Sequence, residues 1–157
     1  MAGDGKPGGD GDDLYQRLVL DHGRHPRNLG PLAGETHGAR GDNPFCGDRW
    51  RVSLIVDGAR VRDVRYEGAG CAISTAAASM MSEAVRGHTR AEVEALGRAF
   101  ERLIGVGAPD DASGVDLGEL AAFAGVRRYP VRVKCARLPW QTLLAALASH
   151  GAGVSTE

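Results

Sequence analysis

Apolar and polar residues alternate most regularly between residues 49 and 66, and such alternation is typical of strands that bury one face. On one side of the segment 49–56 lie Trp50, Val52, Leu54 and Val56. The Asp57-Gly58 pair that follows favours a hairpin turn. The returning strand carries Val61, Val64 and Tyr66. Residues 35–42 give a weaker strand signal, so we expect a meander of three antiparallel strands.

Apolar residues at helical spacing predict one helix before these strands in the sequence and four helices after them. The predicted helices cover residues 13–22, 71–85, 89–104 and 117–124, and a last one contains residues 139–147. Asp13 is expected to cap the first helix, and Thr89 with Glu92 has the pattern of a capping box. Residues 127–134 are expected to be extended and to lead to the last helix. Pro139 is expected in the first turn of that helix.

A single domain is expected to span residues 13–150. With 157 residues and 43% apolar content the chain can bury a sizeable core, and its 23 glycines and 5% aromatic residues indicate small side chains in that core. Residues 1–12 are rich in Gly and Asp and are expected to form a disordered tail, and residues 151–157 a flexible one.

The charge balance narrows the possible partners. Nineteen Lys and Arg against 20 Asp and Glu give a net charge of −1, so no basic excess favours nucleic acid or a membrane surface. The N-terminus has no apolar segment typical of a signal peptide, and no run of about 18 apolar residues occurs, so we expect a cytoplasmic protein. Three cysteines, an odd number, fit a reducing compartment where thiols bind metal or react.

The candidate chemistry lies at the three cysteines. Cys46 and Asp48 stand two residues apart on a turn built from Asn, Pro and Gly. Cys71 follows a Gly-x-Gly segment and Cys135 precedes the predicted last helix, so we expect both near the positive end of a helix dipole, which favours thiolate. Zinc accepts three thiolates and one carboxylate in a tetrahedron. The alternative is that the cysteines are ordinary buried residues, because none belongs to a CxxC pair.

The histidines show no spacing with cysteine or carboxylate that suits a metal site. We therefore expect each of them to be a solvated or capping residue: His22, His25, His37, His88 and His150.

Taken together, four motifs resemble those of the IscU/NifU-like iron-sulfur cluster assembly family, and within it the SufU branch. The motifs are Asp-His-x-x-x-Pro-Arg-Asn-x-Gly at 21–30, Asn-Pro-x-Cys-Gly-Asp at 43–48, Gly-x-Gly-Cys-Ala-Ile-Ser at 68–74, and Lys-Cys-Ala-x-Leu-x-Trp at 134–140. The resemblance implies an α+β fold, with a small antiparallel sheet of about three strands packed by helices. It also implies a zinc ion held by Cys46, Asp48, Cys71 and Cys135.

The resemblance further implies a partner. SufU-type proteins take sulfur from a SufS-type, pyridoxal-phosphate-dependent cysteine desulfurase and deliver it to downstream Suf assembly components. Scaffold members of the family instead assemble a [2Fe-2S] cluster at the equivalent site. Two departures favour the SufU branch: Lys134 stands where scaffolds have histidine, and residues 105–125 form an extra stretch. Since the scaffolds' chaperone-binding motif is also absent, we do not expect an Hsp70-type partner.

We therefore predict a zinc-dependent sulfurtransferase, with Cys46 as the sulfur acceptor because it lies on the flexible turn. Cys135 is the alternative acceptor. Lys134 and Arg132 are further candidate catalytic residues, since a cation near three thiolates lowers the net negative charge of the site. Two other functions stay open, a scaffold that carries a [2Fe-2S] cluster and a structural zinc module without sulfur transfer.

Overall fold

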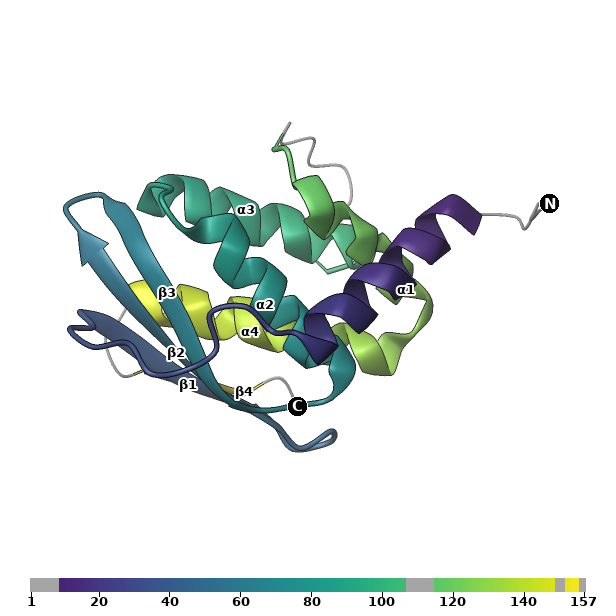
Figure 1. Cartoon of the computed structure of the whole chain (residues 1–157), viewed down its shortest axis with the longest axis horizontal. Helices are drawn as coiled ribbons and strands as arrows, with labels where there is room; N and C mark the ends of the chain where they lie inside the picture. The colour runs from purple at the N-terminus through teal and green to yellow at the C-terminus, as the bar shows by residue number, and fades with distance from the viewer. Residues whose placement is uncertain (1–8, 107–114, 149–151, 156–157) are drawn as a thin grey trace.

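A four-stranded sheet lies against a layer of helices in the computed structural model, which describes residues 9–106, 115–148 and 152–155 (Figure 1). The strands lie in the order β3-β2-β1-β4. Their bounds are β1 His37–Asn43, β2 Asp48–Asp57, β3 Arg60–Ala69 and β4 Ala152–Ser155. Strands β1, β2 and β3 form the antiparallel meander expected from the sequence. The α+β class is confirmed.

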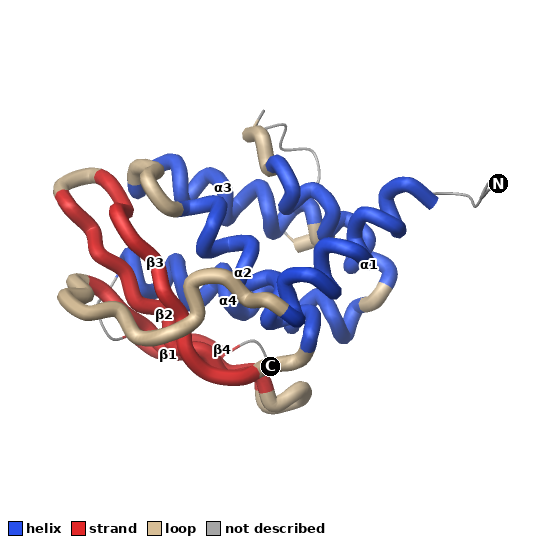
Figure 2. Tube along the Cα trace, in the orientation of Figure 1, coloured by secondary structure: helices blue, strands red, loops and turns tan. Residues whose placement is uncertain are grey.

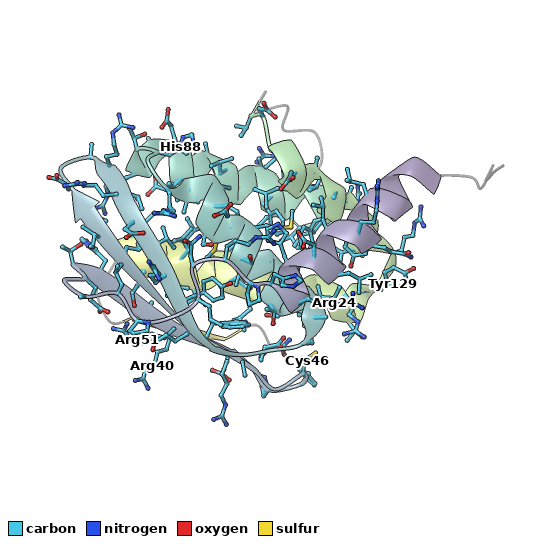
Figure 3. The ribbon with its side chains drawn as sticks, in the orientation of Figure 1. Arg24, Arg40, Cys46, Arg51, His88 and Tyr129 are labelled. Carbon is cyan, nitrogen blue, oxygen red and sulfur yellow. The ribbon has the colours of Figure 1, made fainter. Side chains whose placement is uncertain are left out.

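The burial pattern along β2 follows the alternation of apolar and polar residues in the sequence. Trp50, Val52 and Leu54 are buried and face the helices, while β2 and β3 meet through the turn after Asp57. A register shift between Ile55 and Val56 marks a bulge in this hairpin. Arg40 of β1 pairs in register with Arg51 of β2, and both are labelled in Figure 3. The buried face of the sheet is therefore apolar and the other face is polar.

The fourth strand corrects the expectation of a flexible tail after residue 150. Ala152–Ser155 pairs with β1 in parallel, with Ala39 opposite Ala152. The open edge of β1 offers unpaired backbone groups, and the C-terminal segment occupies that edge. Its short run of small residues contains no alternation that could have revealed a strand.

The helices are α1 Gly9–Arg24, α2 Ala72–Val85, α3 Arg90–Leu103, the 3₁₀ helix η2 Gly118–Arg128, and α4 Pro130–Ala148. Helix α1 begins at Gly9, ahead of the predicted cap at Asp13. Residues 9–12, which we expected in a disordered tail, are therefore helical. The capping box of Thr89 and Glu92 is confirmed, with both reciprocal hydrogen bonds present. Helix η2 passes through Gly125, where we expected it to end.

Helix α4 starts earlier than predicted, and this moves the third cysteine. It begins at Pro130, where a missing N–H costs little, so residues 130–134 are helical and not extended. Pro139, expected in the first turn, lies inside the helix. The β-branched Val131 and Val133, whose helix propensity is slightly low, are nevertheless part of this helix.

Helices α2 and α4 cover the buried face of the sheet, and α4 crosses behind β1 and β2 (Figures 1 and 2). Small residues on α2, among them Ala76 and Ala77, allow close approach. Phe100 stacks on Trp140 with ring centroids 5.4 Å apart. Across the described residues, no helix is both long and apolar enough to cross a membrane.

Candidate metal centre

Two parts of the chain that are distant in sequence meet at one end of the sheet. The turn between β1 and β2 carries Cys46, β2 begins at Asp48, and α4 carries Cys135. The Sγ atoms of Cys46 and Cys135 lie 3.2 Å apart. One ligand atom from each of these three residues lies within 4.8 Å of the others. Figure 3 shows Cys46 near the edge of the molecule, where β1 passes into β2.

The turn that carries Cys46 is held by its own first residue. The Asn43 carbonyl accepts hydrogen bonds from the N–H groups of Cys46 at 3.2 Å and Gly47 at 2.8 Å. The Asn43 side-chain oxygen accepts from the Phe45 N–H at 3.2 Å. Gly47 has φ +76°, which favours glycine. Asn43 is fully buried, so the turn is anchored at its base while Cys46 at its tip is partly exposed.

Asp48 is the most informative residue of the centre. It is fully buried, and its Oδ1 accepts a hydrogen bond from the Cys71 N–H at 2.8 Å. Its Oδ2 is buried without a hydrogen-bond partner among the described residues. A buried carboxylate oxygen with no partner is costly, and a bound cation would remove that cost. The residues present therefore fit a metal ion.

Cys71 is the N-cap of α2, one residue before the helix that the sequence predicted to start at this position. Its Sγ accepts from the Ser74 N–H at 3.4 Å, and Ser74 is held in turn by the Trp50 Nε1–H at 2.6 Å. A hydrogen bond from the Cys135 thiol lowers the pKa of Cys71 to about 6, with help from the Ser74 N–H and against the effect of burial. Cys71 is not part of the group of three described above, but it is joined to that group by its N–H, which donates to Asp48, and by its sulfur, which interacts with Cys135.

Cys135 differs from the prediction. It lies in the second turn of α4 and is fully buried, so it does not stand at the positive end of a helix. Its role as proton donor to Cys71 raises the pKa of Cys135, as do burial and the neighbouring Cys46. Without a cation, the pair thus favours a Cys71 thiolate and a protonated Cys135. A metal ion would favour both thiolates.

The two cations proposed from the sequence have contacts outside the group of Cys46, Asp48 and Cys135. Lys134 Nζ lies 4.7 Å from the centre of the Phe45 ring. Arg132 is exposed, and its charge acts on Tyr15, whose pKa is nonetheless raised to about 12 by burial. The catalytic roles of Lys134 and Arg132 stay predictions.

His22 was misjudged from the sequence. It is 4% exposed, and its Nδ1 lies 2.7 Å from the Ser79 Oγ. Burial lowers the pKa of His22. The residue continues the stripe of Tyr15 and Leu18 on α1, and this spacing was the signal that could have identified a buried position. His150 lies outside the described residues.

Comparison with known families identifies the class. The profile of the "NifU-like N terminal domain" matches residues 14–136, which is most of the chain. The chain therefore belongs to this family of iron-sulfur cluster assembly proteins.

Within the family, the chain is similar to members of two kinds. It is 37% identical to the zinc-dependent sulfurtransferase SufU of Bacillus subtilis, over 90% of this chain and 95% of that protein. It is 36% identical to the iron-sulfur cluster assembly scaffold protein IscU of Streptococcus pyogenes, over 85% of this chain and 82% of that protein. A crystal structure of a scaffold protein for the SUF system from Fervidobacterium islandicum matches with TM-score 0.76 and 33% identity, covering 86% of this chain and 97% of that one.

Proposed function

We propose that this protein is a zinc-dependent sulfur acceptor that takes persulfide sulfur from a SufS-type cysteine desulfurase for iron-sulfur cluster assembly. The observation that carries the proposal is the Oδ2 of Asp48, which is buried without a hydrogen-bond partner among the described residues and lies beside the Cys46 and Cys135 thiols. With Cys71 these groups offer three sulfur donors and one carboxylate oxygen. Thiolate ligands favour zinc or iron-sulfur clusters over calcium or magnesium. Zinc, when bound, would keep the three thiols deprotonated at neutral pH.

Cys46 is the best candidate for the sulfur-accepting thiol. It is partly exposed on a turn, whereas Cys135 is fully buried in α4 and Cys71 caps α2. In the proposed step, the Cys46 thiolate attacks the terminal sulfur of the desulfurase persulfide. A new S–S bond forms on Cys46 as the old one breaks, and the desulfurase cysteine leaves as a thiolate. The exchange is balanced and needs no external oxidant or reductant.

The surface around the proposed acceptor supports a protein partner. Phe45 next to Cys46 is 73% exposed, and Val131, one turn before Cys135, is 66% exposed. These two exposed apolar side chains, on the turn and on α4, could be covered by an apolar surface of a partner. The exposed Arg132 adds a positive charge that would favour an approaching anionic persulfide.

The scaffold function is the main rival. Its support comes from the relatives named as IscU scaffolds. Lys134 argues against it, because a protonated amine cannot ligate iron and its Nζ lies against Phe45. A purely structural zinc site is less well supported, because structural sites are closed and Cys46 is partly exposed.

The test combines two measurements on the purified protein. Sulfide release by a SufS-type desulfurase is measured with and without this protein, and its zinc content is determined in parallel. We expect about one zinc per chain by the stoichiometry of one site, strong stimulation of sulfide release, and added sulfur on Cys46 by mass spectrometry. Cys46→Ser should abolish both the stimulation and the added sulfur.

The alternatives give different results in the same assays. A [2Fe-2S] spectrum that survives desalting after anaerobic reconstitution, without stimulation of the desulfurase, would establish a scaffold. Full zinc content without stimulation would establish a structural module. Added sulfur found only on Cys135 would move the acceptor role to that residue.

A further inference from the structure

The turn that carries Cys46 rests on α4 through two neighbouring contacts. The first joins the sulfur atoms of Cys46 and Cys135 at 3.2 Å. The second joins the preceding residue of each pair, with Lys134 Nζ 4.7 Å from the centre of the Phe45 ring. An ammonium group at this distance from an aromatic face makes a cation–π contact. The turn and α4 therefore share two contacts. One is between the two cysteine sulfur atoms, and the other is between Phe45 and Lys134, which offer no ligand to a metal.

The Phe45 side chain contributes little to the core and does not maintain the internal shape of the turn. At 73% exposure it contributes little to the core. The shape of the turn is maintained by the hydrogen bonds to Asn43, which do not use the Phe45 side chain. The contact with Lys134 therefore constrains the position of the turn against α4 and leaves its internal shape unaffected.

We propose that Phe45 and Lys134 form a latch that holds the Cys46 turn on α4 and controls how often the Cys46 thiol leaves its place beside Cys135. This inference deepens the proposed function, since Cys46 is the proposed sulfur acceptor there. Lys134 is then a positioning residue, which acts on the reactive thiol through Phe45. An exposed cation–π contact of this kind changes an opening equilibrium by about 2- to 5-fold.

The latch can be tested by the alkylation rate of Cys46. Full-length purified protein is treated with iodoacetamide, and peptide mass spectrometry follows Cys46 relative to Cys71 in the same sample. Rates are compared at the high-pH plateau, because removing the Lys134 charge also changes thiol ionisation. We expect Phe45→Leu and Lys134→Met each to raise the Cys46 rate about 2- to 5-fold. Lys134→Arg keeps a cation over the ring and should react like wild type.

A double variant separates a latch from two unrelated surface effects. If the two residues act through one contact, Phe45→Leu with Lys134→Met should react no faster than the faster single variant. Rates that multiply in the double variant, or a Phe45→Leu rate equal to that of wild type, would overturn the proposal. Melting curves of all variants confirm folding, which we expect because Phe45 is exposed.

The same samples keep the two proposals apart. Metal content and sulfide production test the proposed function, while the ratio of Cys46 to Cys71 alkylation tests the latch. A protein without zinc or without desulfurase stimulation would end the proposed function and leave the latch measurable. Unchanged alkylation in a zinc-containing, active protein would end the latch alone.

Discussion

Two clusters of polar side chains in this fold contain fully buried members but differ in how completely their groups are hydrogen-bonded. One is the candidate metal centre, formed by Cys46, Asp48 and Cys135 with the neighbouring Cys71. The other, which we call the α2 clamp, consists of His22, Asn28, Ser79 and Ser82 and ties the segment after α1 to helix α2. Both contain fully buried polar residues, Asp48 in the first and Ser79 and Ser82 in the second.

The four side chains that define the α2 clamp are hydrogen-bonded to one another or to nearby backbone groups, although Nη1 of the adjoining Arg27 is buried without a partner among the described residues. The Ser79 Oγ accepts the Arg27 N–H at 2.9 Å and lies 2.7 Å from the His22 ring. The Ser82 Oγ accepts from Asn28 Nδ2 at 2.9 Å and donates to the Ser79 carbonyl at 2.7 Å. Asn28 adopts φ +63°, a conformation that asparagine tolerates. The motif at residues 21–30 is thus explained by local structure.

In the candidate metal centre, Asp48 Oδ2 has no partner in the part of the chain that the structure describes. A cluster whose buried groups are paired contributes stability by itself, whereas a buried carboxylate oxygen without a partner carries a cost that a bound cation would remove. The unpartnered oxygen of Asp48 lies beside the Cys46 and Cys135 thiols, and this combination makes the cluster a candidate metal site.

Removing a proposed ligand should have the largest effect. Cys135→Ala deletes the thiol that neighbours both Cys46 and Cys71. We expect zinc content to fall from about one per chain to nearly none and the melting temperature to drop by several degrees or more, since metal binding contributes to folding. Atomic absorption and thermal melts measure both. Ser82→Ala, in the α2 clamp, is the matched control and should keep its zinc; full zinc content in Cys135→Ala would contradict the assignment.

Breaking the α2 clamp should lower the stability of the protein without lowering its zinc content. Ser79→Ala leaves the Arg27 N–H and the His22 ring without their partner, which should lower the free energy of unfolding by about 1–3 kcal/mol. Zinc content should stay at the wild-type value. Urea unfolding with metal analysis checks both quantities. Thr75→Ala on the same helix, where the hydroxyl is exposed, should change stability by less than about 0.5 kcal/mol. Zinc loss in Ser79→Ala would show that the two clusters are coupled.

The comparison also shows what the sequence could reveal. The alternation at Trp50, Val52 and Leu54 predicted β2, because one buried face imposes a period of two. The position of Cys71 at the start of α2 was predicted for a similarly local reason, from the glycines before it and the apolar stripe after it.

The features that were missed depend on distant parts of the chain. Strand β4 forms because β1 has an open edge, which no pattern within Ala152–Ser155 encodes. Cys135 was placed before its helix because Pro130 and Pro139 each suit a first turn, and packing decides between them. The burial of His22 depends on Ser79, which lies 57 residues away in sequence.

The smallest expected effect is a pH dependence of the free energy of unfolding that arises from His22 in the α2 clamp. Burial lowers the pKa of His22 below its ordinary 6.5, so the unfolded chain binds the proton more readily than the folded one. Between the lowered pKa and 6.5 the unfolded state holds more protons, and the free energy of unfolding therefore rises with pH in that window. Acidification below 6.5 should destabilise the wild type by at most about 1.4 kcal/mol per pH unit through this group.

His22→Gln removes the titration while leaving an amide that can reach Ser79. We expect the variant to be less stable than wild type at pH 7.5 and to lose less stability on acidification to pH 5.5, so that the two curves converge. Urea unfolding at several pH values measures the difference between them, and groups common to both proteins cancel. Parallel curves would mean that His22 takes up its proton without cost in the folded state. In that case the clamp would contain a charge that Glu119, whose carboxylate lies 4.0 Å from the His22 Nε2, stabilises.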